Sequence, residues 1–119
     1  MAKFSKILIM LVRALALVSI VLGVLIWTGR MPNLLGSHMA LGFTITLLIA
    51  ILAVLALAKR AFPLGVLGII VCVALPWIGL RQFPLSFMHL GAIQLAHILV
   101  VIAALGIAER LSSAIRKAA

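Results

Sequence analysis

The stretch FMHLGAIQLAHILVVIAALGIAE, residues 87–109, decides how the rest of the chain is interpreted. It is long and apolar enough to cross a bilayer, since roughly 20 apolar residues in an α-helix span the hydrocarbon core. It also contains His89, Gln94 and His97, and it ends on Glu109, the one acidic residue in the chain. Polar and ionisable side chains are costly at membrane depth unless they find partners, so each is a candidate functional residue. The stretch predicts a transmembrane helix with a specialised face.

The composition of the whole chain predicts an integral membrane protein. Of its 119 residues, 67% are hydrophobic and 9% are charged, and the mean hydropathy is +1.46. In soluble domains about a quarter of the residues are charged, so this chain does not have the composition of a soluble domain. We find no motif for a nucleophile, a hydrolytic triad or a phosphate-binding loop, and we therefore expect neither a hydrolase nor a transferase.

Four apolar runs use nearly all of the sequence, which predicts one all-α transmembrane domain over residues 1–119. Because the connections are short, sequential spans should run antiparallel and form a four-helix bundle. The last span should fray beyond Glu109 into the basic tail. The predicted spans are about 7–27, 35–58, 63–80 and 86–109.

The basic residues predict the orientation of the bundle. Eight of the ten Lys and Arg residues fall on one side of the predicted spans, and only Arg30 and Arg81 fall on the other. Loops on the cytoplasmic side carry the excess of Lys and Arg, so both termini should be cytoplasmic, in a bacterial inner membrane. This pattern also accounts for the net charge of +9 without nucleic acid as a partner. The eight residues are Lys3, Lys6, Arg13, Lys59, Arg60, Arg110, Arg116 and Lys117.

Three histidines, His38, His89 and His97, remain once the terminal bases are explained by topology. Counted from Lys59 and Glu109, His38 and His89 both lie about 30 Å from the cytoplasmic edge at 1.5 Å per residue. His97 lies roughly 12 Å deeper than His89 on the same helix. Depth alone therefore favours His89 as the residue opposite His38.

Imidazoles on facing helices can hold a haem, because each ring nitrogen can donate a lone pair to the iron. We predict haem b with His38 as one axial ligand and either His89 or His97 as the other. The alternative is structural: His38 and His89 bond to headgroups or water at the interface, and His97 bonds to a carbonyl of a neighbouring helix. Three histidines on two spans favour haem.

Four further residues are candidates to support a haem. Arg30 and Arg81 lie on the outer side, where haem propionates would need cations. Gly42 follows His38 by one turn and leaves room for a flat macrocycle. Gln94 precedes His97 by about one turn and could orient its imidazole, although a packing role is an equal alternative. Together these residues predict an electron-transfer subunit with its haem near the outer membrane face.

Glu109 has a candidate partner in Arg13. Both residues lie near the cytoplasmic ends of their predicted spans, so the two side chains can pair across the bundle. A structural salt bridge is favoured here over a proton-relay acid.

Three short motifs of this chain resemble parts of other membrane proteins. The motifs HMALG (residues 38–42), IQLAH (93–97) and GIAE (106–109) resemble parts of small four-span bacterial membrane proteins, and this resemblance marks His38 and His97. A looser similarity is to four-helix membrane cytochromes of the b type. It implies haem between histidines of facing helices and electron transfer.

Two other functions stay open at this point. The chain could be a structural or accessory subunit of a larger membrane complex without a cofactor of its own. It could also be a small homo-oligomeric transporter that uses His97 as a protonatable site. The partners we expect are the lipid bilayer and, for a redox subunit, other membrane subunits, a quinone or a periplasmic redox protein.

Overall fold

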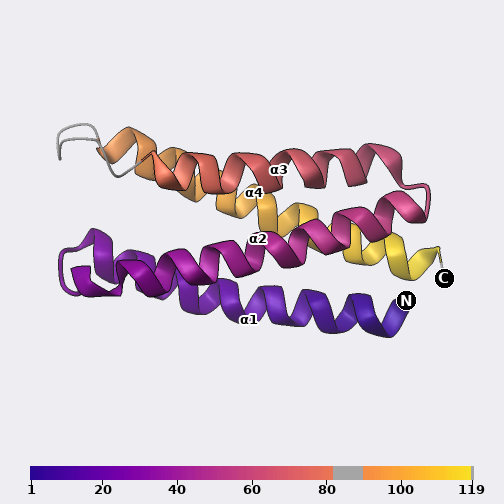
Figure 1. The fold of residues 1–119 in the computed structure, drawn as a ribbon, viewed down its shortest axis with the longest axis horizontal. Helices are drawn as coiled ribbons and strands as arrows, with labels where there is room; N and C mark the ends of the chain where they lie inside the picture. The colour runs from indigo at the N-terminus through magenta and orange to yellow at the C-terminus, as the bar shows by residue number, and fades with distance from the viewer. Residues whose placement is uncertain (82–89, 119) are drawn as a thin grey trace.

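The computed structural model of the chain describes residues 1–81 and 90–118, and all regular structure in this part is helical (Figure 1). Each of the four α-helices is long and apolar enough to cross a membrane, so the chain is a multi-pass membrane protein. The elements are α1 (Ala2–Trp27), the short 3₁₀ helix η1 (Pro32–Leu34), α2 (Leu35–Ala58), α3 (Phe62–Leu80) and α4 (Leu90–Lys117).

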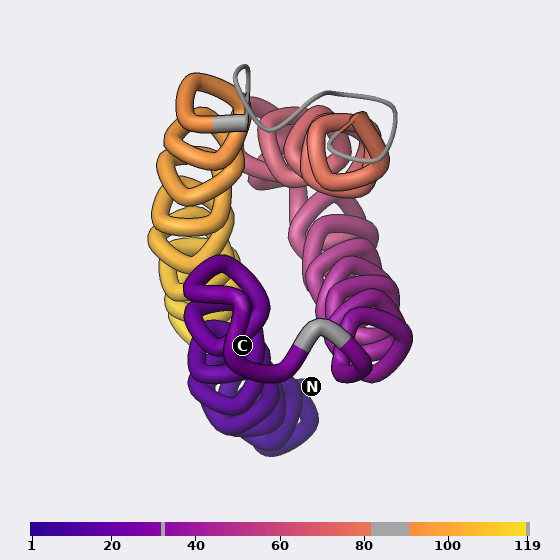
Figure 2. The backbone as a smooth tube through the Cα atoms, turned by 90° about the vertical axis from the view of Figure 1, so that its left-hand side faces the viewer, coloured from indigo at the N-terminus to yellow at the C-terminus, as the bar shows by residue number. Residues whose placement is uncertain are grey.

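The helices lie side by side, and both termini lie at the same end of the molecule (Figure 1). Seen along the helices, they surround a common axis in chain order (Figure 2). Each helix contacts the next, and α1 also contacts α4. Of the two diagonal pairs, α2 and α4 contact one another, whereas α1 and α3 make no contact within the described residues. Residues of α2 and α4 are therefore the ones that can meet across the bundle.

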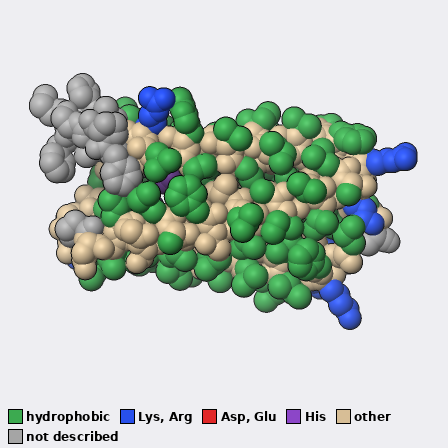
Figure 3. Space-filling view, in the orientation of Figure 1, with side chains coloured by type: hydrophobic (Ala, Val, Ile, Leu, Met, Phe, Trp, Pro, Cys, Tyr) green, Lys and Arg blue, Asp and Glu red, His purple; other side chains and the backbone are tan. Residues whose placement is uncertain are grey.

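Hydrophobic side chains cover most of the face seen in Figure 3, while most of its visible Lys and Arg side chains project at the end that carries both termini. Apolar residues such as Leu17, Val73 and Ile102 are more than half exposed. In a membrane protein this surface is the one that contacts lipid, because the hydrocarbon is as apolar as the side chains.

Two helix ends differ from the predicted spans. Helix α1 begins at Ala2 rather than near residue 7, and α4 remains helical to Lys117, so the prediction that the chain frays beyond Glu109 is wrong. The predicted start of the last span, near residue 86, lies outside the described residues. The tail stays helical because Leu111 and Ile115 are fully buried in the core.

A pair of buried hydroxyls ties this tail to the first helix. Ser5 Oγ and Ser112 Oγ lie 2.8 Å apart, and both side chains are fully buried. Buried hydroxyls require hydrogen-bond partners, and here each supplies the other. The two serines therefore set α1 and α4 level with one another near the termini.

The buried core is concentrated in the half of the bundle that carries the termini, which we call the terminal half. The other half carries the α1–α2 connection, and we call it the loop half. Few of its described residues are buried: Ala16, Ser19, Ile45 and Leu75. The loop half is therefore the more loosely packed part of the described structure. The buried apolar residues of the terminal half are Leu8, Ile9, Val12, Ile49, Leu52, Ala53, Ala56, Val71, Ala104, Ala108, Leu111 and Ile115.

Gly68 on α3 allows three helices to approach closely in the terminal half. A Cβ atom at Gly68 would lie 2.8 Å from the Cβ of Ala53 on α2 and 3.0 Å from a methyl carbon of Leu111 on α4. We expect Gly68→Ala to destabilise the folded state by about 1–3 kcal/mol, because the overpacked helices must separate. Equilibrium unfolding by SDS in mixed micelles measures this change.

The matched control is Gly106→Ala on α4, where an added Cβ meets no atom within 4 Å. Both substitutions share the gain in helix propensity that alanine has over glycine. Equal stabilities of the two variants would contradict the close approach at Gly68.

Candidate functional site

Two of the three predicted histidines meet in the loop half of the bundle. The ring centroids of His38 on α2 and His97 on α4 lie 6.3 Å apart, and the ring planes are inclined by 71°. The third, His89, lies outside the described residues. The structure thus brings His97 to His38, whereas the depth argument from sequence favoured His89.

The register of α4 against α1 explains why His97 is level with His38. Glu109 is not the end of the last span, and the hydrogen bond between Ser5 and Ser112 sets the level of α4. From Ser5 to Ser19 is 14 residues along α1, and from Ser112 to His97 is 15 residues along α4. These are nearly equal rises of about 21 and 22.5 Å at 1.5 Å per residue. Since Ser19 bonds to His38, His97 arrives at the same level.

Helix α1 holds the imidazole of His38. Its Nδ1 lies 2.9 Å from the backbone carbonyl oxygen of Ser19 and 3.2 Å from the Ser19 hydroxyl. A carbonyl oxygen can only accept, so Nδ1 carries the hydrogen and donates it. The other nitrogen, Nε2, then has a free lone pair. Histidines that bind metals are commonly oriented in this way, with the second ring nitrogen bonded to a carbonyl or carboxylate.

His97 has a buried nitrogen with no protein partner. Its Nδ1 atom is enclosed by the protein and makes no hydrogen bond within the described residues. Buried polar atoms are almost always paired, so an exception points to strain or to a missing partner. The described residues therefore leave the hydrogen bonding of His97 incomplete, at an atom that lies on the side of Gly79 of α3.

Two glycines that the sequence analysis missed lie against the two imidazoles. A Cβ at Gly23 of α1 would lie 3.1 Å from Cε1 of His38, and one at Gly79 of α3 would lie 3.4 Å from Cε1 of His97. All four helices therefore contribute to the site. Gly23 follows Ser19 by four residues and so lies on the same helix face, which is a signal that the sequence contains.

The other predicted support residues are more loosely connected with the pair. Gly42 has open space around it, since an added Cβ would meet no atom within 4 Å. Gln94 is half-buried and forms no hydrogen bond within the described part of the chain. Arg30 is exposed after α1, and the guanidinium of Arg81 lies 4.5 Å from the ring centroid of Trp77. No described contact joins these four residues to the two imidazoles.

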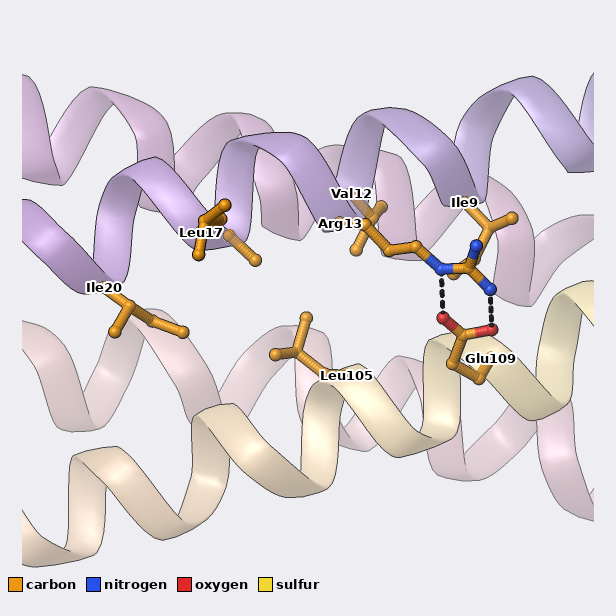
Figure 4. Close-up of a pocket in the computed structure, with 8 residues that line it drawn as sticks. Ile9, Val12, Arg13, Leu17, Ile20, Leu105 and Glu109 are labelled. Carbon is orange, nitrogen blue, oxygen red and sulfur yellow. Dashed lines mark hydrogen bonds and ion pairs between the residues drawn. The ribbon is translucent and has the colours of Figure 1, made fainter.

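The only acidic residue pairs with Arg13 at the α1–α4 interface (Figure 4). Nε of Arg13 donates to one carboxylate oxygen of Glu109 over 2.6 Å, and Nη2 donates to the other over 2.7 Å. This two-bond geometry is the one in which an arginine holds a carboxylate best. The pair lies at one end of a groove of about 260 Å³ between the two helices.

Removing one partner of this pair should destabilise the protein more than removing both. We expect Glu109→Gln to lower the midpoint of SDS unfolding, because it leaves the Arg13 guanidinium without its counter-charge in a membrane helix. The double variant Arg13→Gln/Glu109→Gln should recover part of that loss, since no charge is then left unpaired. A double variant that is less stable than either single variant would show that the pair is not coupled in this way.

The donor set limits what metal the site can hold. Within residues 1–81 and 90–118 there is no group of three or more His, Cys, Asp or Glu side chains placed to bind a metal ion. Metal ions held by protein ligands alone usually need three or four such donors. A haem iron needs only one or two axial ligands from the protein, because the porphyrin supplies the others.

Comparisons with protein-family models, with curated proteins and with solved structures find no match to this chain.

Proposed function

We propose that the chain is a haem b-binding membrane protein that transfers electrons, with His38 and His97 as the two axial ligands. The observation that carries the proposal is the pair itself: two imidazoles from different helices at 6.3 Å, one oriented by a carbonyl and the other with a buried nitrogen that has no partner among the described residues. Buried nitrogens are rarely left without a partner, so the absence of one for His97 Nδ1 among the described residues supports a role for His97 beyond packing.

The spacing of the rings fits a shared metal. With metal–nitrogen bonds of about 2 Å on each side, imidazoles on opposite sides of one metal atom have ring centroids roughly 6 Å apart. The observed separation of 6.3 Å agrees with this value. An imidazole pair without a metal also occurs at such distances, since edge-to-face rings typically lie about 4.5–7 Å apart. The distance therefore supports the proposal together with the unpartnered nitrogen.

The surroundings of the pair also suit a large flat group. The described residues of the loop half are less buried than those of the terminal half. Open space adjoins Gly42, which lies one turn beyond His38. At Gly23 and Gly79 the backbones of α1 and α3 lie against the edges of the two rings, so these helices restrict the positions of the imidazoles.

When bound, the haem would supply reversible one-electron chemistry at its iron. The chain's own residues would hold and tune it. The Ser19 carbonyl fixes the orientation of His38 and raises the basicity of its free nitrogen. Arg30 and Arg81, on the side of the loop half, would provide cations for the propionates.

The placement in the membrane is part of the same proposal. The distribution of Lys and Arg favours an antiparallel four-helix bundle with both termini in the cytoplasm of a bacterial inner membrane. The histidines then lie towards the outer face. An electron partner would reach them from the periplasmic side or from within the membrane, as a redox protein, a quinone or another subunit.

A reduced-minus-oxidised absorption spectrum of the purified protein tests the proposal. After expression with ample haem supply, we expect a Soret band and a sharp α-band at close to one haem per chain. Absence of both bands under these conditions would favour the second function, an accessory subunit in which His38 bonds only to Ser19.

A further inference from the structure

The groove between α1 and α4 is a second candidate site, independent of the histidines. Its walls come from both helices and end at the ion pair of Arg13 and Glu109 (Figure 4). The apolar wall residues Leu17, Ile20 and Leu105 continue from the ion pair towards the loop half. The groove is therefore charged at one end and apolar along the rest.

The ion pair does not use all the donors of Arg13. Its Nε and Nη2 bond to Glu109, while Nη1 has no protein partner within the described residues. The side chains of Arg13 and Glu109 are 59% and 41% exposed. Within a membrane such an exposed charged pair faces lipid, where charged groups are costly unless something polar covers them.

Two more cations lie on the same helix faces. Lys6 precedes Arg13 by seven residues and Arg116 follows Glu109 by seven, and a spacing of two helical turns returns to one face. Nε of Arg116 donates to the carbonyl of Ser112, whose hydroxyl meets Ser5 on α1, so Arg116 lies on the side of α4 that faces α1. The charged end of the groove thus combines three cations, Lys6, Arg13 and Arg116, with the single anion Glu109, so its net charge is positive.

We propose that this groove binds an anionic phospholipid of the leaflet that contacts the termini. The phosphate would be held by Lys6, Arg116 and the free Nη1 of Arg13, and one acyl chain would lie along Leu17, Ile20 and Leu105. Charge complementarity selects this occupant over a neutral lipid, and the apolar walls select a lipid over free phosphate. Basic pockets between transmembrane helices are known sites for anionic headgroups.

Native mass spectrometry of the purified full chain tests the site. Phosphatidylglycerol and phosphatidylcholine with the same acyl chains are added in parallel, and glycerol 3-phosphate serves as a headgroup without chains. We expect one phosphatidylglycerol to stay bound at activation energies that remove phosphatidylcholine, and no adduct with glycerol 3-phosphate. Equal retention of the two lipids would overturn the proposal.

Charge-matched variants separate the groove from the general positive charge of this end. Lys6→Gln/Arg116→Gln should weaken phosphatidylglycerol binding about tenfold or more, from the loss of two headgroup contacts. The control Lys59→Gln/Arg60→Gln removes the same charge from the α2–α3 connection and should leave binding unchanged. Equal weakening in both variants would show a diffuse surface effect and would overturn the proposal.

A second pair of variants tests the apolar part of the groove. Ile20→Trp puts a larger side chain into the groove, whereas Val18→Trp places the same side chain on another face of α1. The two native residues are similarly exposed, Ile20 at 45% and Val18 at 50%. Only Ile20→Trp should weaken phosphatidylglycerol binding, and equal binding by the two variants would contradict the acyl-chain contact. None of these variants touches the histidines, so the absorption spectrum reports independently on the haem proposal.

Discussion

A His97→Ala variant is expected to lose the low-spin spectrum of the proposed haem, and His38→Ala is expected to do the same. Loss of a residue that merely orients a metal ligand typically weakens metal binding by about 10–100-fold, and loss of the ligand itself should exceed that. We therefore expect haem content after purification to fall to a small fraction of that of the unmodified chain. Any haem that remains should show a high-spin spectrum, since one axial position is empty.

The controls distinguish ligation from general damage to the fold. Leu95→Ala changes a lipid-exposed residue on the same helix and should retain the spectrum. Free imidazole added to His97→Ala should restore low-spin absorption, because it can occupy the vacated position; a purely structural role would not allow this rescue. His89→Ala is the decisive comparison. An intact spectrum in His97→Ala together with a lost one in His89→Ala would transfer the ligand role to His89.

Leu111→Ala is expected to destabilise the protein by about 2 kcal/mol or more, through the cavity it leaves in the core. Leu111 is fully buried, and it packs against the Gly68 position of α3 although it lies beyond Glu109, where the sequence predicted fraying. In a membrane this loss of stability comes mainly from lost packing contacts, because lipid surrounds the separated helices with an equally apolar medium. Equilibrium unfolding by SDS measures it.

The matched variant is Leu99→Ala, at a position on α4 where the leucine is 58% exposed. Substitutions at such surface positions usually change stability by less than about 0.5 kcal/mol. If residues 110–117 were frayed, Leu111→Ala would behave like Leu99→Ala. A similar loss in Ile115→Ala, another fully buried residue of this tail, would support the packed arrangement.

The sequence predicted the pair of Arg13 with Glu109, and it left two candidates, His89 and His97, as the partner of His38. It singled out His38, His97, Arg13 and Glu109, because polar side chains stand out in a chain that is 67% hydrophobic. The sequence places Gly23 on the helix face of Ser19, but it does not connect Ser19, Gly23 or Gly79 with the histidines. Their role depends on which faces of α1 and α3 turn towards the pair, and apolar residues surround both glycines in the sequence.

An all-helical membrane protein with four helices able to span a bilayer can be predicted from the amino-acid sequence, since length and hydropathy are local properties of each segment. Which histidines meet depends instead on how the helices pack. That choice depends on the level of α4 against α1, which is set by the bond between Ser5 and Ser112 across 107 residues and by the packing of Leu111 and Ile115. Helix α4 continues to Lys117, eight residues or about 12 Å beyond Glu109, which is also the spacing of His89 and His97. Counting from Glu109 as the end of the helix therefore placed His97 well away from the level of His38.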